Sequence, residues 1–469
     1  MTEPKSAATE LGTERIRKLL VQYAVPAIIA MTASSLYNMV DSIFIGQIVG
    51  PLAISGLALT FPLMNLAAAF GALVGVGAAT LISMRLGQRD YETAQRVLGN
   101  VVVLNGILGV AFAVAAIAFL DPILYFFGGS EATVGYAHEY MTIILAGNVV
   151  THMYLGLNSV LRASGHPRKS MYATINTVVI NTVLDALFIY GFGWGIRGAA
   201  LATVLAQVVS LVWQFRILSD KNELLRFRRG IYRLQGRIVR DIVAIGMSPF
   251  LMNVAACFIV ILINKGLHRY GGDLMIGAYG IVNRLAFFFV MIVIGVNQGM
   301  QPIAGYNFGA RQYDRVLRVL KLTAMGATCV TTLGFLIGEL APGPAASLFT
   351  RDRELIGLAA TGMRIVFVAF PIIGFQMVAT NFFQSIGMAG KAVFLSLSRQ
   401  LLFLVPGLLL LPRFFAASTP WDGSWGVWCA MPLSDFLSAV VTFFMLTAQL
   451  RRFRAMMTAQ TPNDPHNGK

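Results

Sequence analysis

Two aspartates lie inside long apolar stretches, where a charged side chain is unfavourable. Asp41 stands in a run that is otherwise almost uncharged from Val21 to Met84, and Asp185 stands in the segment INTVLDALF. A carboxylate in hydrocarbon costs roughly 2.5–3.5 kcal/mol on insertion scales, and an ionisable residue inside a membrane marks a functional site by default. The chemistry open to such carboxylates is the binding and release of a proton or of a hard monovalent cation.

Polar side chains accompany the two aspartates at a similar depth. Asn181 stands four residues before Asp185, hence on the same helical face, and Thr203 lies about two turns into the next apolar segment from the same side. Two carboxylates close together in a low dielectric repel each other, so at least one should bind a proton readily. The same oxygens could instead coordinate Na⁺. We expect an ion-coupling and cation-binding site at Asp41, Asn181, Asp185 and Thr203, with Tyr37, Asn38 and Asp435 as secondary candidates.

The composition indicates the class of protein in which this site works. Of the 469 residues, 57% are hydrophobic and 12% are charged, whereas a soluble protein carries about 25% charged residues. Such a chain cannot cover a water-facing surface. Its apolar segments are long enough for membrane-spanning helices, which need about 20 residues, and they lack the alternation of a membrane barrel. We therefore expect an all-α polytopic membrane protein.

The net charge of +15 would suggest a nucleic-acid partner in a soluble protein. Here the simpler explanation is that Lys and Arg collect in the cytoplasmic loops of membrane proteins, so we expect no nucleic acid. The three cysteines lie in apolar runs without metal-ligand spacing, and we expect them to be free. We expect no cofactor, no metal site other than the possible Na⁺ site, and no cleaved signal peptide.

Apolar runs bounded by charge, Gly and Pro predict twelve membrane-spanning helices. Their spans are 18–48, 52–84, 96–120, 134–160, 168–190, 196–217, 239–265, 274–304, 316–341, 356–384, 391–413 and 424–449. The loops on one side hold most of the basic residues, including Arg162, Arg168 and Lys169. The opposite loops hold only Arg197, Lys265, Arg269, Arg351, Arg353 and Arg413. Both termini are therefore expected in the cytoplasm.

The chain also repeats itself at a spacing of 222 residues. LGQRDYETAQRVL at 86–98 and FGARQYDRVLRVL at 308–320 share Gly, Arg, Tyr, Arg, Val and Leu, and the same spacing pairs Gly165 with Gly387. We expect two homologous six-helix bundles related by an axis along the membrane normal, as in alternating-access transporters that bind substrate between the halves. The predicted parts are the segment 1–17, the bundle 18–217, the basic cytoplasmic linker 218–238, the bundle 239–450 and the cytoplasmic tail 451–469.

The second half lacks the pair of aspartates, since Asn264 aligns with Asp41 and Gly407 aligns with Asp185. A purely structural need would more readily appear in both halves, which favours a role in ion coupling. Asp435 is better explained by a structural role. Three arginines within the second-half spans could reach the membrane interface, pair with Asp435 or repel cations. They are Arg284, Arg364 and Arg399.

Two stretches carry a family resemblance. The run YNMVDSIFIGQIVGPLAISGLALTFPLMNLAAAFGALVGVGAATLISMRLGQRD and the run LRASGHPRKSMYATINTVVINTVLDALF resemble the MATE (multidrug and toxic compound extrusion) family of efflux transporters, in particular its DinF-like and MepA-like bacterial members. The resemblance covers residues 15–452 and implies twelve helices in two lobes, with export of organic cations coupled to inward H⁺ or Na⁺. The family's first-lobe coupling cluster carries over onto Asp41, Asn181, Asp185 and Thr203.

The sequence departs from one branch of that family, which places a Glu in helix 7 and an Asp in helix 10. Here helix 7 has no acidic residue between Asp241 and Asp273, and the range 355–381 has none at all. A second-lobe sodium site of that kind is therefore not expected.

The resemblance implies a secondary active antiporter that exports organic cations or amphipathic drugs, not an enzyme. We expect a monomer surrounded by lipid in a bacterial inner membrane. The main alternative is a flippase for lipids or lipid-linked saccharides, which would need a cavity lined by Arg and Lys. A membrane-embedded enzyme is disfavoured, because the sequence has no HExxH motif, serine nucleophile elbow or Cys/His nucleophile arrangement.

Overall fold

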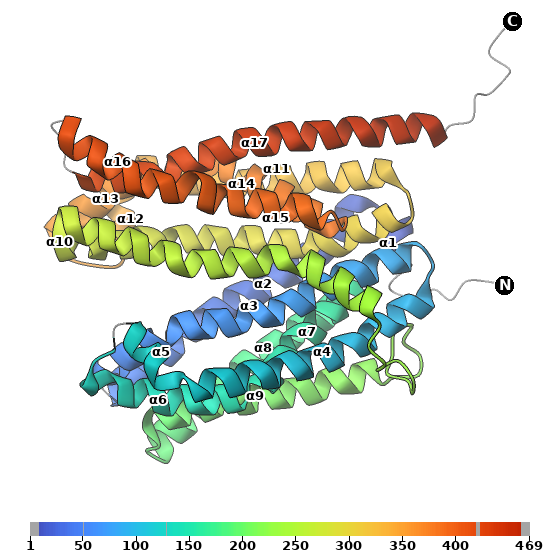
Figure 1. The fold of residues 1–469 in the computed structure, drawn as a ribbon, viewed down its shortest axis with the longest axis horizontal. Coiled ribbons are helices and arrows are strands. Elements are labelled where there is room, and N and C mark those ends of the chain that lie inside the picture. The colour runs from blue at the N-terminus through green and yellow to red at the C-terminus, as the bar shows by residue number, and fades with distance from the viewer. Residues whose placement is uncertain (1–8, 50, 128, 419–422, 461–469) are drawn as a thin grey trace, which may run out of the picture.

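The protein folds into long helices arranged in two layers. The structure is a computed structural model that describes residues 9–49, 51–127, 129–418 and 423–460. Within these ranges the chain is helical and contains no strand, which confirms the predicted all-α class. The first half of the chain and the second half form separate layers in Figure 1.

The first layer contains the helices up to residue 218. They are α1 (Glu10–Thr13), α2 (Ile16–Phe44), the π-helical η1 (Ile45–Val49), α3 (Pro51–Gly87), α4 (Tyr91–Ala118), α5 (Leu120–Phe126), α6 (Glu131–Ala146), α7 (Asn148–Ala163), α8 (Pro167–Asp185), the π-helical η2 (Ala186–Gly191) and α9 (Gly195–Leu218).

The second layer contains the helices from residue 236 onward. They are α10 (Gly236–Gly309), α11 (Tyr313–Leu340), α12 (Pro342–Ser347), α13 (Arg353–Phe367), α14 (Phe370–Ser385), α15 (Ala389–Leu397), the π-helical η3 (Ser398–Leu404), α16 (Val405–Ser418) and α17 (Gly423–Gln460).

The described part of the chain offers ten helices long and apolar enough to cross a membrane, and twelve if each of two bent pairs is one span. The bent pairs are α6 with α7, at 56°, and α13 with α14, at 52°. The sequence predicted each pair as one straight helix, 134–160 and 356–384. Pro371 begins the second member of one pair, where its ring favours a helix start. Gly147 separates the other pair.

Another difference concerns the predicted helices 239–265 and 274–304. Both belong to α10, a helical run that bends sharply at Gly272, where φ is 70° and ψ is −166°. Glycine adopts this conformation without the steric penalty that a Cβ would bring. The predicted loop between the two spans is therefore replaced by a bend at a single glycine.

The repeat seen in the sequence is a repeat of structure. Both bounds of α4 recur 222 residues later in α11, and both bounds of α7 recur at the same offset in α14. The bend before α7 recurs before α14. Each half thus builds the same succession of helices.

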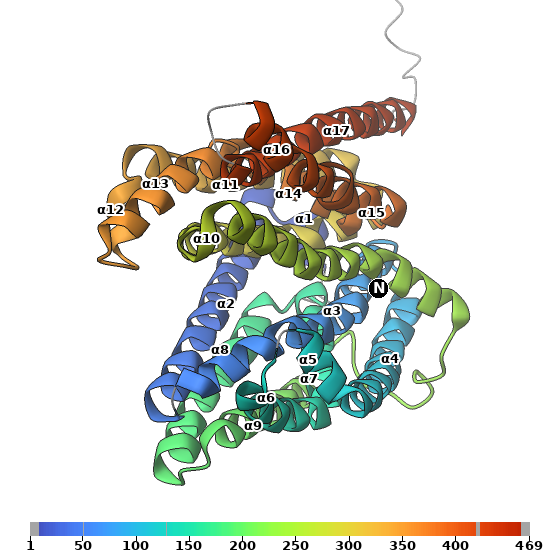
Figure 2. The ribbon, with the colours of Figure 1, turned by 60° about the vertical axis from the view of Figure 1, so that its left-hand side comes forward.

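The two halves share a hydrophobic core at one end only. We call this end, which holds α1 and the segment 219–235, the near end, and the opposite end, with α5 and α12, the far end (Figure 1). The near-end core joins residues of both halves, such as Leu19, Ile82, Ile242 and Met300. The far-end cores are separate, one within residues 45–200 and one within residues 259–430. Figure 2 shows α10 along the boundary between the layers.

Four glycines bring the backbones of α3 and α10 together at the near end, and we call them the glycine seam: Gly77, Gly87, Gly246 and Gly309. A Cβ added to Gly246 would overlap the carbonyl oxygen of Leu73. A Cβ on Gly87 would overlap the carbonyl of Tyr306, and one on Gly309 would overlap that of Met84. These last two contacts are equivalent under the 222-residue repeat, so the seam has internal twofold character.

Polar contacts close the near end further. Leu11 is buried, and its carbonyl accepts hydrogen bonds from Asn307 Nδ2 (3.0 Å) and Arg315 Nη2 (3.1 Å). Arg315 also donates to the carbonyl of Glu14 at 2.7 Å. The chain before α2 is therefore fastened to the second half.

The segment 219–235 is fastened to the first half instead. Glu223 accepts from Lys169 Nζ at 2.8 Å and lies 2.6 Å from His166 Nε2. Burial alone would raise the pKa of the Glu223 carboxyl, but the hydrogen bonds from Lys169 and His166 outweigh burial and lower it. Gln95 receives the backbone N–H of Arg226 at 3.2 Å.

The seam predicts opposite effects for two glycine-to-alanine changes. Gly246→Ala should lower stability by about 1–3 kcal/mol, the usual effect of overpacking, because the new methyl meets a backbone carbonyl. Gly106→Ala is the matched control, since nothing lies within 4 Å of its added Cβ, and it should leave stability unchanged or raise it slightly. Apparent melting temperatures in detergent would measure this. Equal melting temperatures for the two variants would contradict the seam.

Candidate functional site

Three of the predicted site residues meet inside the first half. Asp185 is fully buried, Asn181 is 1% exposed and Thr203 is 8% exposed. Asn181 Nδ2 lies 3.4 Å from Asp185 Oδ1 and 3.4 Å from Thr203 Oγ1. The Thr203 hydroxyl donates to the carbonyl of Ala199 at 3.1 Å. The structure thus brings together a carboxylate, an amide and a hydroxyl, and we call these three residues the Asp185 cluster.

The amide of Asn181 donates to the carboxylate in either of its two orientations. With nitrogen and oxygen exchanged, Nδ2 donates to Asp185 Oδ2 at 3.2 Å and Oδ1 accepts from the Thr203 backbone N–H at 3.1 Å. This second orientation satisfies both ends of the amide. In both cases Asp185 faces an N–H group of Asn181.

Helical spacing and a local change of helix type position the Asp185 cluster. Asn181 and Asp185 are four residues apart on α8, so they share one face, and α8 packs against α9, which carries Thr203. Asp185 is the last residue of α8 before η2 begins. Short π-helical segments often occur at functional sites, and η1, which contacts η2, begins four residues after Asp41.

The remaining first-half candidates lie on α2. The backbone at Tyr37, Asn38 and Asp41 is helical, but their side chains lie outside the described part of the structure. α2 packs against α8, the helix that holds Asn181 and Asp185. The approach of Asp41 to Asp185 remains a prediction.

Asp435 lies on α17, in the second half, where it pairs with Arg399. The distance from Arg399 Nε to Asp435 Oδ1 is 2.6 Å, and the Asp435 side chain is 5% exposed. Ser434 Oγ donates to the carbonyl of Arg399 at 2.7 Å. Of the alternatives considered for Arg399, pairing with Asp435 is the one found, whereas Arg284 and Arg364 are exposed.

The corresponding positions of the second half offer different chemistry. Asn264, which aligns with Asp41, is partly buried on α10. A Cβ at Gly407, which aligns with Asp185, would lie 3.3 Å from the Cβ of Ala430. The close packing leaves little space for a longer side chain there. Within the described residues, no group of three or more His, Cys, Asp or Glu could hold a metal ion.

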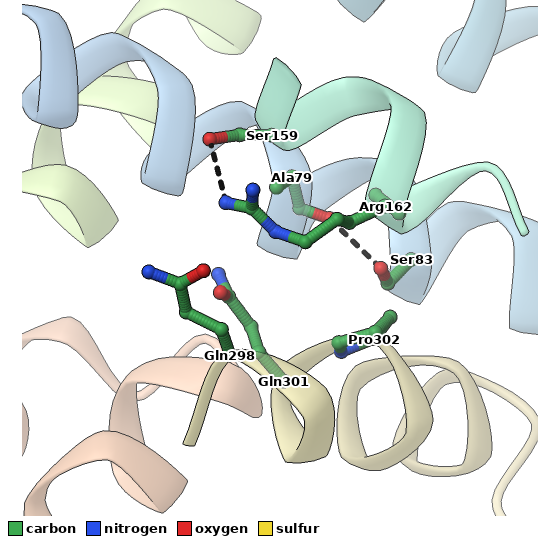
Figure 3. Close-up of a pocket in the computed structure, with 8 residues that line it drawn as sticks. Ala79, Ser83, Ser159, Arg162, Gln298, Gln301 and Pro302 are labelled. Carbon is green, nitrogen blue, oxygen red and sulfur yellow. Dashed lines mark hydrogen bonds between the residues drawn. The ribbon is translucent and has the colours of Figure 1, made fainter. Parts of the chain in front are cut away.

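Sequence reasoning misplaced one functional candidate, Arg162. It was counted among the loop cations, but it lies in the last turn of α7 and points between the halves. Figure 3 shows Arg162 opposite Gln298 and Gln301 of α10. Its guanidinium donates to Ser170 Oγ at 3.2 Å and to Ser159 Oγ at 3.1 Å.

The gap around Arg162 is polar and has no room for a water molecule. Gln301 Nε2 crosses between the halves and donates to Thr80 Oγ1 at 2.8 Å. Gln298 Oε1 is buried without a hydrogen-bond partner among the described residues. The repeat gave one signal that could have found this position, because Arg162 aligns with Gln384, a neutral residue.

Comparisons with known proteins agree with this architecture. The sequence model of the MatE family matches residues 26–187 and 247–409, once in each half. The multidrug export protein MepA of Staphylococcus haemolyticus is 26% identical over 431 residues, covering 92% of this chain and 93% of that protein.

Solved structures resemble the chain over nearly its whole length. The MATE multidrug transporter DinF-BH, solved in complex with a ligand, is 36% identical, with a TM-score of 0.86 over 95% of this chain and 98% of that chain. A multidrug resistance MATE family transporter solved in an outward-facing conformation is 25% identical, with a TM-score of 0.88 over 97% of this chain and 100% of that one. The chain therefore belongs to the MATE family and is a multi-pass membrane transporter, not an enzyme.

Proposed function

We propose that the protein is a secondary active multidrug antiporter that exports organic cations in exchange for H⁺. The observation that carries this proposal is the fully buried Asp185, hydrogen-bonded to Asn181 beside Thr203. A buried carboxylate in a membrane helix can carry a proton. The similar MepA proteins are named for multidrug export, and the similar DinF-BH is a multidrug transporter.

The hydrogen bonds favour a proton over Na⁺ as the coupling ion. A sodium ion at Asp185 would need several oxygen ligands directed toward it. Asn181 instead directs an N–H group at Asp185 in both amide orientations. A proton needs no such shell, because it binds directly to a carboxylate oxygen.

Exchange follows from the charge of the Asp185 cluster and Asp41. An ionised carboxylate pair attracts an organic cation. A proton that enters neutralises one carboxylate, weakens this attraction and releases the cation. Reciprocity requires the bound cation to weaken proton binding by the same factor, so each ligand promotes departure of the other.

Alternating access would come from the two halves. In this proposal the bundles 18–217 and 239–450 move relative to each other, joined by the linker 218–238. The near end faces the cytoplasm of a bacterial cell, as the distribution of basic loops indicates. The shared near-end core then corresponds to a state closed to the cytoplasm.

The orientation can be tested with single cysteines in a variant whose three native cysteines are replaced. Ser130→Cys and Ser347→Cys lie at exposed far-end positions, and Asn222→Cys lies at an exposed near-end position. A membrane-impermeant maleimide should label the first two in intact cells and the third only after the membrane is opened. The reverse pattern would overturn the orientation.

The coupling role can be tested by isosteric substitution. Asp41→Asn and Asp185→Asn keep shape and polarity, and Asn can still accept the Asn181 N–H, but neither variant can ionise. Each should insert and fold yet lose proton-driven efflux of a cationic dye from proteoliposomes, down to the level of protein-free vesicles. Asp435→Asn is the control, because its partner is Arg399; it should lose less transport per folded molecule. Wild-type pumping by both first-half variants would contradict the proposal.

Dye affinity should depend on pH. As pH falls through the apparent pKa of the coupled carboxylates, protonation competes with the cation, and affinity should fall by about tenfold per pH unit if one proton is exchanged. Equilibrium binding of a fluorescent cation to folded protein would measure it. An affinity that stays constant from mildly alkaline to acidic pH, with sodium absent, would exclude proton exchange.

A further inference from the structure

A groove of about 300 Å³ opens in the second half, between α11, α14 and α17. Its walls are apolar and include Leu317, Phe375, Leu446 and Leu450. Two cations, Lys321 and Arg454, complete the lining, and both are exposed. This volume is within the range of small-molecule pockets, about 300–1,000 Å³. The combination of an apolar trough with two cations fits an amphiphile that has an anionic head.

The two cations continue the apolar faces of antiparallel helices. Lys321 follows Leu317 by four residues on α11, and Arg454 follows Leu450 by four residues on α17. Phe453 stacks on Tyr313 with ring centroids 5.4 Å apart, which fixes the register of the two helices. Long side chains lean toward the N-terminus of their own helix, so we expect Lys321 and Arg454 to lean toward each other across the groove.

The cations have no internal counter-ion. Among the residues that the structure describes, no carboxylate lies within 4.0 Å of Lys321 or Arg454, whereas Lys169 in the first half pairs with Glu223 at 2.8 Å. Two neighbouring like charges repel each other. An external anion at this point would relieve that repulsion.

The first half shows that the equivalent surface is normally covered. Gln95 and Gly99 precede Leu317 and Lys321 by the repeat spacing of 222 residues. Gln95 binds the backbone of Arg226, and a Cβ at Gly99 would overlap the carbonyl of Ile231. The segment 219–235 therefore fills the first-half counterpart of the groove. In the second half α17 continues as a helix past this level, and the groove stays open.

The groove faces away from the transport path. α17 lies on the side of the second layer remote from α2 and α9, in both views (Figure 1, Figure 2). A molecule that enters here comes from the surrounding membrane. The residues 461–469, TPNDPHNGK, contain no large apolar side chain, so they do not suit an apolar trough.

We propose that this groove binds an anionic phospholipid of the leaflet at the near end, with an acyl chain along Leu446 and Leu450 and the phosphate between Lys321 and Arg454. Basic pockets between membrane helices are suited to lipid head groups of this kind. The proposal is independent of the direction of transport and of the coupling ion, because the leaflet at the near end supplies the lipid on whichever side it lies.

The test is native mass spectrometry of the full-length protein in micelles with phosphatidylglycerol or with phosphatidylcholine of the same acyl chains. The wild-type protein should retain phosphatidylglycerol in preference. Lys321→Gln/Arg454→Gln should reduce this preference by about thirtyfold, the effect of two cations near an anionic surface. The matched control is Arg351→Gln/Arg353→Gln, two exposed far-end cations, and it should behave as the wild type does.

A second variant tests the apolar part. Ala324→Trp adds a large ring to a residue that lines the groove and leaves both cations in place, so it should also lower phosphatidylglycerol retention. Retention by Ala324→Trp would show surface charge alone and overturn the groove, and wild-type retention by the Lys321/Arg454 variant would overturn the site. Equal binding of phosphatidylcholine would overturn the anionic head group. Displacement of phosphatidylglycerol by inorganic phosphate would show a free-anion site instead.

Discussion

The backbones of α3 and α10 approach so closely at the near end that one added methyl group at Gly246 would meet the carbonyl of Leu73. Contact of this kind is short-ranged, because dispersion falls steeply once a small gap opens. The halves are therefore either sealed at this end or parted. The twofold relation of the contacts at Gly87 and Gly309 means that one relative movement breaks equivalent contacts together. A transporter that exposes its site to one side at a time depends on such a seal.

The two halves repeat in architecture but differ in chemistry. The first half buries Asp185 with Asn181, whereas the second half places an ion pair between Arg399 and Asp435. A buried charge with a permanent partner is held in one state, which suits a structural element. A carboxylate that has only amide and hydroxyl groups around it in the first half can change its charge more readily. This difference supports coupling in one half and mechanical response in the other.

The sequence was sufficient for the parts of the account that depend on hydropathy and helical spacing. The i, i+4 placement of Asn181 and Asp185 and the depth of Thr203 predicted the three residues that meet. The bends before α7 and α14 could not be predicted, because an apolar run has the same hydropathy whether straight or bent. The direction of Arg162 was missed because the rotation of a helix near its end is set by tertiary packing. The groove at Lys321 and Arg454 needs three helices distant in sequence, and only the structure brings them together.

The central claim is that a proton and an organic cation compete at the buried carboxylates of the first half. The most direct measurement is the number of protons released when a dye binds to purified protein in weakly buffered solution, over a range of pH. Release should rise from none at alkaline pH to about one proton per dye at acidic pH, and Asp185→Asn should abolish it. Dye binding without proton release at every pH would contradict the account.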